Sequence, residues 1–152
     1  MSTLPSIPVK EAVTLTSNWR TYYAALSTEA NPAQPISPNS PEVFRGFRIP
    51  LEDLEKIIAV AREYNEKNAS PINSVRAYLV KDTPDIRHNK DIHLILVPVV
   101  GGKEMQAGLS PFGTDLLGPK GVEDETDTFI YDYTSPCPAQ CDTESILYSN
   151  EF

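Results

Sequence analysis

An apolar run at residues 92–99 predicts the central strand of a β-sheet. Residues 94–97 follow one another without a polar side chain, and a strand that is apolar on both faces must be covered on both. Pro98 has no N–H to donate, so this end of the run is expected at a sheet edge or a strand terminus. Residues 75–80 alternate apolar and polar side chains, which predicts a neighbouring strand with one buried face.

The segments around these strands predict the rest of the sheet. Residues 81–91 are too polar to bury, which favours an antiparallel hairpin with a long exposed loop. Gly101 and Gly102 permit a tight hairpin turn, which predicts a short strand at residues 103–106. Residues 108–121 are rich in glycine and proline and predict a loop. The β-branched and aromatic residues 128–133 predict a strand that returns to the sheet.

Apolar residues at helical spacing predict two helices. The first covers residues 9–27, and its stripe is expected to face the core or, as the less favoured alternative, to line a ligand cleft. That stripe consists of Ala12, Leu15, Trp19, Tyr22 and Leu26. The second helix covers residues 50–67, opens at Pro50 and buries a stripe of four residues. These four are Leu54, Ile57, Ile58 and Ala61.

A proline-rich segment separates the two helices. Residues 31–41 contain four prolines, which excludes a helix or an interior strand and favours an extended linker. A single helical turn is expected to begin at Ser40 and to end at Gly46. Arg45 and Arg48 flank that glycine and are candidates for holding an anion near the start of the second helix, although solvated surface arginines are the more common case.

The elements sum to an α+β fold, in which two main helices pack on one face of a small, mainly antiparallel sheet. The length of 152 residues suits one domain over residues 1–152. Within it we expect an N-terminal arm at residues 1–8, a proline-rich linker at 28–41 and an irregular C-terminal tail at 134–152.

The charge distribution narrows the class of partner. Residues 1–120 carry 13 basic and 13 acidic side chains, whereas residues 121–152 carry eight acidic and no basic ones. This acidic segment argues against nucleic acid as a partner and can instead meet a basic surface on another protein or another copy. Without a signal-like or membrane-spanning apolar stretch, no membrane partner is expected and the expected location is cytoplasmic.

Cys137 and Cys141 are the most unusual pair of side chains. A local structural pair, reduced or joined in a disulfide, is the favoured interpretation. A metal site would need His88 and His93 as further ligands, in an order reversed relative to a zinc finger. Redox catalysis is less favoured because the prolines on both sides of Cys137 make an extended backbone more probable than a helix start. No cofactor is expected.

Several motifs occur in a fixed order along the chain. They are an Asn18-Trp19-Arg20 helix, a Phe-Arg-Gly-Phe-Arg-Ile-Pro helix start, a Val-Arg-Ala-Tyr strand, a Leu-Ile-Leu-Val-Pro-Val strand and a Tyr-Asp-Tyr-Thr-Ser-Pro-Cys-Pro-x-x-Cys tail. With them the chain resembles a family of small uncharacterised soluble proteins of Bacteroidetes bacteria. The resemblance covers most of the chain and implies a bacterial protein whose tail belongs to the domain. It implies no activity and no catalytic residue.

The sequence therefore favours a non-enzymatic interaction or structural protein that self-associates as a homo-oligomer or larger assembly. No catalytic set is recognisable, and the tail carries apolar and aromatic side chains that are poorly suited to a solvated end. The expected interaction residues are Ile146, Leu147, Tyr148 and Phe152. The alternatives are a thiol redox or metal-binding protein that uses Cys137 and Cys141, and a small-ligand carrier with a pocket between the Trp19 helix and the sheet.

Overall fold

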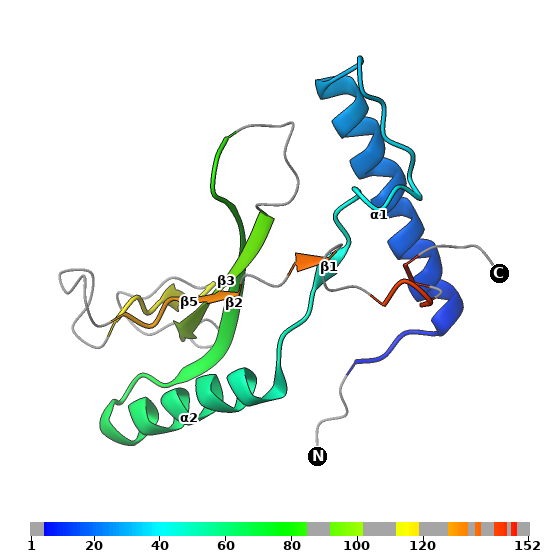
Figure 1. Ribbon diagram of the computed structural model, residues 1–152. Helices are drawn as coiled ribbons and strands as arrows, with labels where there is room; N and C mark the ends of the chain where they lie inside the picture. The colour runs from blue at the N-terminus through cyan, green and yellow to red at the C-terminus, as the bar shows by residue number, and fades with distance from the viewer. Residues whose placement is uncertain are drawn as a thin grey trace. The chain divides into compact units, whose positions relative to one another are not determined.

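The computed structural model in Figure 1 describes seven stretches of the chain. They are residues 5–84, 92–101, 112–118, 128–133, 136–137, 142–145 and 147–148. The chain divides into two compact units. Unit 1 comprises Met1–Arg48, Lys81–Ile92 and Ser135–Phe152, and unit 2 comprises Ile49–Val80 and His93–Thr134.

Unit 1 is built on helix α1, Val9–Ala30 (Figure 1). Its start after Pro8 is as predicted, but it runs three residues beyond the predicted end. The N–H of Asn31 still bonds to the Ser27 carbonyl at 3.0 Å. Asn31 precedes Pro32, which disfavours helical backbone at Asn31, and the helix stops there.

The predicted burial of the α1 stripe is wrong. Tyr22 is 60% exposed, and Leu15, Trp19 and Leu26 are exposed as well. The buried residues of α1 are instead Arg20 and Ala24, which lie four positions apart on another face of the helix. The periodicity identified residues that share a face, but it could not tell which face the rest of unit 1 covers.

The proline-rich segment is irregular from residue 31, as predicted, but it contains turns, and residues 28–30 of the predicted linker belong to α1. Its Ile36 N–H bonds to the Thr28 hydroxyl of α1 at 3.0 Å. The helical turn expected at Ser40 is a plain turn, in which the Val43 N–H reaches the Ser40 carbonyl at 3.1 Å. Gly46 does not end a helix, because it belongs to strand β1, Gly46–Phe47, which pairs antiparallel with β6, Pro136–Cys137.

Unit 2 contains helix α2, Leu51–Lys67, with Pro50 as its N-cap residue, which confirms the second predicted helix. Glu52 and Asp53 lie in its first turn and Lys67 in its last, an arrangement that suits the helix dipole. Ile57 is buried, but Ile58 is exposed, so the predicted buried stripe is narrower than the sequence indicated.

The sheet of unit 2 is antiparallel and has four strands. Strand β2 is Ile72–Lys81, and β3 is Ile92–Val100. The short strands β4, Thr114–Asp115, and β5, Tyr131–Tyr133, both pair with β3. The central position of β3 and the α+β class are therefore confirmed. Figure 1 shows β2 and β3 running side by side.

Several details of the sheet differ from the sequence-based expectation, and the strand predicted at residues 128–133 is confined to β5. Pro98 lies inside β3 rather than at an edge or end. It falls between Leu96, the last residue paired with β5, and Val99, the first paired with β4. Pro98 has no N–H to donate, and it stands where β3 changes from one partner strand to the other. Strand β4 lies within a segment predicted as loop, and the strand predicted at residues 103–106 lies outside the described residues.

The core of the sheet follows β3. Its buried apolar residues are Leu94, Leu96, Val97, Val99 and Val100. Strand β2 does not have the predicted buried face, because Val75 is 44% and Leu79 61% exposed. Among the described residues, no helix is long and apolar enough to cross a membrane.

Candidate interaction site

Two arginines of unit 1 bind consecutive carbonyl groups of the C-terminal segment. Arg20 Nη1 donates to the carbonyl oxygen of Leu147 at 2.9 Å, and Arg45 Nε donates to that of Tyr148 at 3.0 Å. Arg20 comes from the buried face of α1, and Arg45 directly precedes β1. We call these four residues the tail site.

Two turns present the carbonyls to the arginines. The first turn begins at Asp142, whose carboxylate accepts the Glu144 N–H at 3.1 Å and whose carbonyl accepts the Ser145 N–H at 3.2 Å. The second begins at Ser145, whose carbonyl accepts the Tyr148 N–H at 2.8 Å. Asp and Ser favour such turns because their side chains accept from backbone N–H groups two residues on. The carbonyls of Leu147 and Tyr148 follow these turns and accept from guanidinium groups.

Arg45 is held on three sides. Besides its bond to Tyr148, its Nη1 donates to the Val43 carbonyl at 2.6 Å, and its Cζ lies 3.9 Å from the centroid of the Tyr148 ring. That position permits a cation–π interaction. Burial lowers the pKa of Arg45, Tyr148 opposes this effect, and the positive charge of Arg20 lowers the pKa further.

The tail site therefore brings two cations into a partly desolvated place. Arg20 is only 2% exposed, and after burial its positive charge also acts to lower the pKa of Arg45. Charged donors that leave water need acceptors to offset the lost hydration. The two carbonyls of the C-terminal segment supply such acceptors.

An aromatic cluster holds α1 against the chain that leads to Arg45. The Trp19 indole N–H donates to the Phe44 carbonyl at 2.8 Å. The Trp19 ring lies 5.7 Å from that of Tyr23, and the Phe44 ring lies 5.0 Å from that of Phe47, centroid to centroid. These spacings are typical of favourable ring packing. The cluster fixes the backbone on both sides of the two arginines.

The structure places two of the four expected interaction residues in this site. Leu147 and Tyr148 contribute their carbonyls, and the Leu147 side chain remains exposed. Ile146 and Phe152 lie outside the described residues. Sequence reasoning treated Arg45 only as a candidate anion holder and did not single out Arg20. The available signal for Arg20 was its position next to Trp19, at the border of the predicted apolar stripe of the first helix.

The cysteine and histidine candidates are only partly described. The backbone of Cys137 belongs to β6, while its side chain, Cys141 and His88 lie outside the described residues. His93 lies on β3, where its Nδ1 is 2.6 Å from a carboxylate oxygen of Asp132 on β5. Among the described residues, no group of three or more histidine, cysteine or acidic side chains is placed to hold a metal ion.

A second polar cluster lies on the sheet of unit 2. The Asp115 carboxylate of β4 accepts from Arg76 and from the Tyr78 hydroxyl, both on β2. Arg76 also donates to the Phe112 carbonyl at 2.9 Å. Because β3 lies between β2 and β4, these contacts cross the central strand. The cluster joins the two flanking strands on one face of the sheet.

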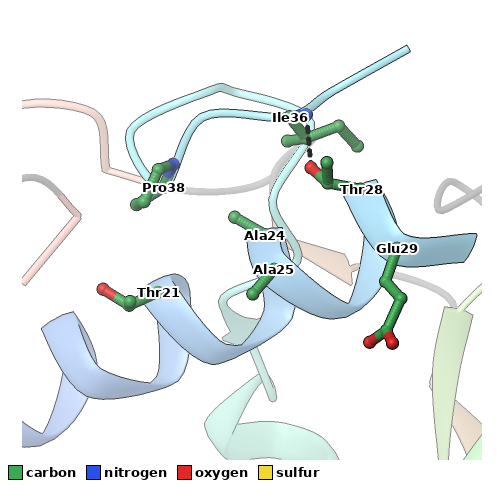
Figure 2. A pocket seen from close by; sticks show the side chains of 7 residues that line it. All are labelled: Thr21, Ala24, Ala25, Thr28, Glu29, Ile36 and Pro38. Atoms are coloured by element: carbon green, nitrogen blue, oxygen red, sulfur yellow. Dashed lines mark hydrogen bonds between the residues drawn. The ribbon is translucent and has the colours of Figure 1, made fainter. Parts of the chain in front are cut away.

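An open groove runs along α1 (Figure 2). It measures about 490 Å³ and lies between α1 and the proline-rich segment. The lining residues are Thr21, Ala24, Ala25, Thr28, Glu29, Ile36 and Pro38. Figure 2 shows the Glu29 side chain pointing away from Ile36 and Pro38. Trp19, which the ligand-carrier hypothesis placed beside a pocket, does not line this groove.

Comparisons with protein-family models, curated proteins and solved structures find no match for this chain. The resemblance to a Bacteroidetes family therefore stays an expectation.

Proposed function

We propose that this chain is a non-enzymatic interaction protein that self-associates, with the C-terminal segment of one copy bound by Arg20 and Arg45 of another. The observation that carries the proposal is the pair of hydrogen bonds from Arg20 and Arg45 to the carbonyls of Leu147 and Tyr148. These contacts use backbone atoms and one aromatic ring, and a second copy offers the same groups. Exchange of a terminal segment between identical chains is a low-cost route to an oligomer.

Charge supports this choice of partner. The tail belongs to the stretch of residues 121–152 that has eight acidic and no basic side chains, and its binding residues are two arginines. Opposite charges of this kind favour encounter and suppress wrong partners. The exposed apolar stripe of α1 adds surface that is typical of interaction sites.

The first experiment compares molecular mass in solution by light scattering after size-exclusion chromatography. The full chain is expected to give a mass above that of one copy, and a chain ending at Thr134 should give a lower mass. A chain ending at Cys141 is the matched variant, because it removes the tail site contacts and retains the residues of β6. A full chain that remains a monomer at high concentration would contradict the proposal.

A mixing experiment tests exchange directly. A labelled chain ending at Cys141 has the two arginines but lacks residues 142–148. The full-length Arg45→Ala variant keeps those residues but lacks the donor that binds the Tyr148 carbonyl within its own chain. The labelled chain should bind the Arg45→Ala variant more tightly than it binds unlabelled copies of itself. Equal binding to both would show that the tail does not carry the association.

A further inference from the structure

Strand β2 presents an unusually long edge. In the described part of the chain it pairs with β3 and has no strand on its other side. It is ten residues long, about twice the usual strand length, and it contains no proline. Natural sheets generally protect such edges with short strands, prolines, bulges or charges, because an open edge pairs with another chain.

The side chains of β2 divide between the two faces of the sheet. Arg76 and Tyr78 both reach Asp115, so they share a face. By alternation, Val75, Ala77 and Leu79 lie on the other face, and all three are exposed. The charge of Arg76 is thus directed over its own sheet toward Asp115. The other face of this edge is apolar and open.

From this pattern we propose that two copies pair through their β2 edges, antiparallel and related by a two-fold axis at Ala77. An axis of this kind places one residue opposite its own copy. Two registers overlap the ten-residue strand equally well, one centred on Arg76 and one on Ala77. The first places Leu79 opposite the partner subunit's Asn73 and Val75 opposite the partner subunit's Ala77, so the exposed Val75 and Leu79 side chains do not meet.

The register centred on Ala77 places complementary residues opposite one another. Val75 faces the partner subunit's Leu79, and Arg76 faces the partner subunit's Tyr78. The first pair is apolar and occurs twice across the two-fold axis, and apolar cross-strand pairs of this kind are stabilising. Recognition by strand addition to a sheet edge is a common mode of binding. This interface uses none of the residues of the tail site.

Cysteine cross-linking of the full chain tests the register. Directly opposed residues on antiparallel strands have Cβ atoms close enough for a disulfide. Under mild oxidation, Ala77→Cys should give at least ten times more covalent dimer than Val75→Cys or Leu79→Cys. The unaltered chain serves as the control, because it measures the covalent dimer that forms through the native Cys137 and Cys141 alone. Equal cross-linking at all three positions, or none at Ala77→Cys, would overturn the proposal.

Two charge variants test the same pairing without new thiols. Val75→Glu with Leu79→Lys places opposite charges across the two-fold axis, whereas Val75→Lys with Leu79→Lys places like charges there. At low salt, the like-charge variant should have a dimer dissociation constant at least tenfold higher, and added salt should narrow the difference. Equal constants would contradict the register.

The cross-linking is repeated in the full-length Arg45→Ala variant to separate the two interfaces. Dimer formation through Ala77→Cys should persist there, because the β2 edge does not use the tail site. Its loss would overturn the proposal of an independent interface. If the cross-link persists while the labelled chain binds the Arg45→Ala variant and its own copies equally, that combination would reject tail exchange and leave β2 pairing as the mode of association.

Discussion

Arg20 and Leu147 are 127 positions apart in the sequence, yet the Arg20 guanidinium donates to the Leu147 carbonyl at 2.9 Å. The bond joins the buried face of the first helix to the C-terminal segment. Arg45 makes the equivalent contact with the next carbonyl, that of Tyr148. Unit 1 therefore depends on acceptors supplied by nearly the last residues of the chain.

Replacement of Arg45 should release the C-terminal segment. Arg45→Ala removes a charged donor from both Tyr148 and Val43, and we expect unfolding free energy to fall by about 2 kcal/mol. Arg45→Lys should recover only part of this loss because an ammonium lacks the planar fork. Urea unfolding measures the change, and faster proteolysis after residue 141 should accompany it. Arg48→Ala, at an exposed position, is the control and should change stability by less than about 0.5 kcal/mol.

Replacement of Asp115 should loosen the sheet. Asp115→Asn removes the charge that Arg76 and Tyr78 share, and we expect a loss of about 1–2 kcal/mol. Tyr78→Phe removes a single hydroxyl and should cost about 1 kcal/mol. Because both changes affect one cluster, the double variant should lose less than the sum. Strict additivity in urea unfolding would show that the two contacts act independently.

Gly113 and Gly46 form a matched pair for substitution by alanine. Gly113 has φ +85°, and a Cβ there would lie 2.3 Å from Val99 Cγ1 on the buried strand β3. Gly46 has no atom within 4 Å of the same position. Gly113→Ala should therefore destabilise the protein by at least about 2 kcal/mol through backbone strain and the clash. Gly46→Ala should change the thermal midpoint only slightly, and an equal effect of both would contradict this assignment.

The ion pair between Glu63 and Lys67 on α2 should make a small, pH-dependent contribution to stability. The hydrogen bond and charge of Lys67, 2.7 Å away, lower the pKa of Glu63 from 4.5. A carboxyl with a lowered folded-state pKa stabilises the fold above its unfolded-state pKa and loses this effect as pH falls through the folded-state value. Glu63→Gln should thus be slightly less stable at pH 7, and the difference should vanish at acid pH. A difference that persists at acid pH, measured by urea unfolding, would rule out this origin.

The elements best predicted from sequence are those encoded by local pattern. The apolar run of β3 and the amphipathic α2, which begins after Pro50, have nearly the predicted bounds because neighbouring residues determine both. The two-residue strands β1, β4 and β6 exist only through their partners and leave no periodicity to detect. The predicted burial of the α1 stripe failed for a different reason. Periodicity shows which residues share a face of the helix, but it does not show which face the rest of the protein covers.

The candidate site could be predicted only in part. The tail was singled out for its apolar and aromatic side chains, yet the contacts that hold it use backbone carbonyls. Every residue has a carbonyl, so composition carries no signal for this kind of binding. The turns at Asp142 and Ser145 that orient these carbonyls are recognisable in sequence only once the arginines are known to face them.

Trp19 is the only tryptophan of the chain, and its position makes it an optical probe of unit 1. Its indole N–H is bound to the Phe44 carbonyl and the residue is 36% exposed, so loss of this environment should shift its fluorescence to longer wavelength. Circular dichroism reports on both units, through α1 of unit 1 and through α2 and most of the main sheet in unit 2, whereas tryptophan emission reports on unit 1 alone. Coincident transitions of the two signals would mean that the units unfold together, and separate transitions would give the stability of each unit in one experiment.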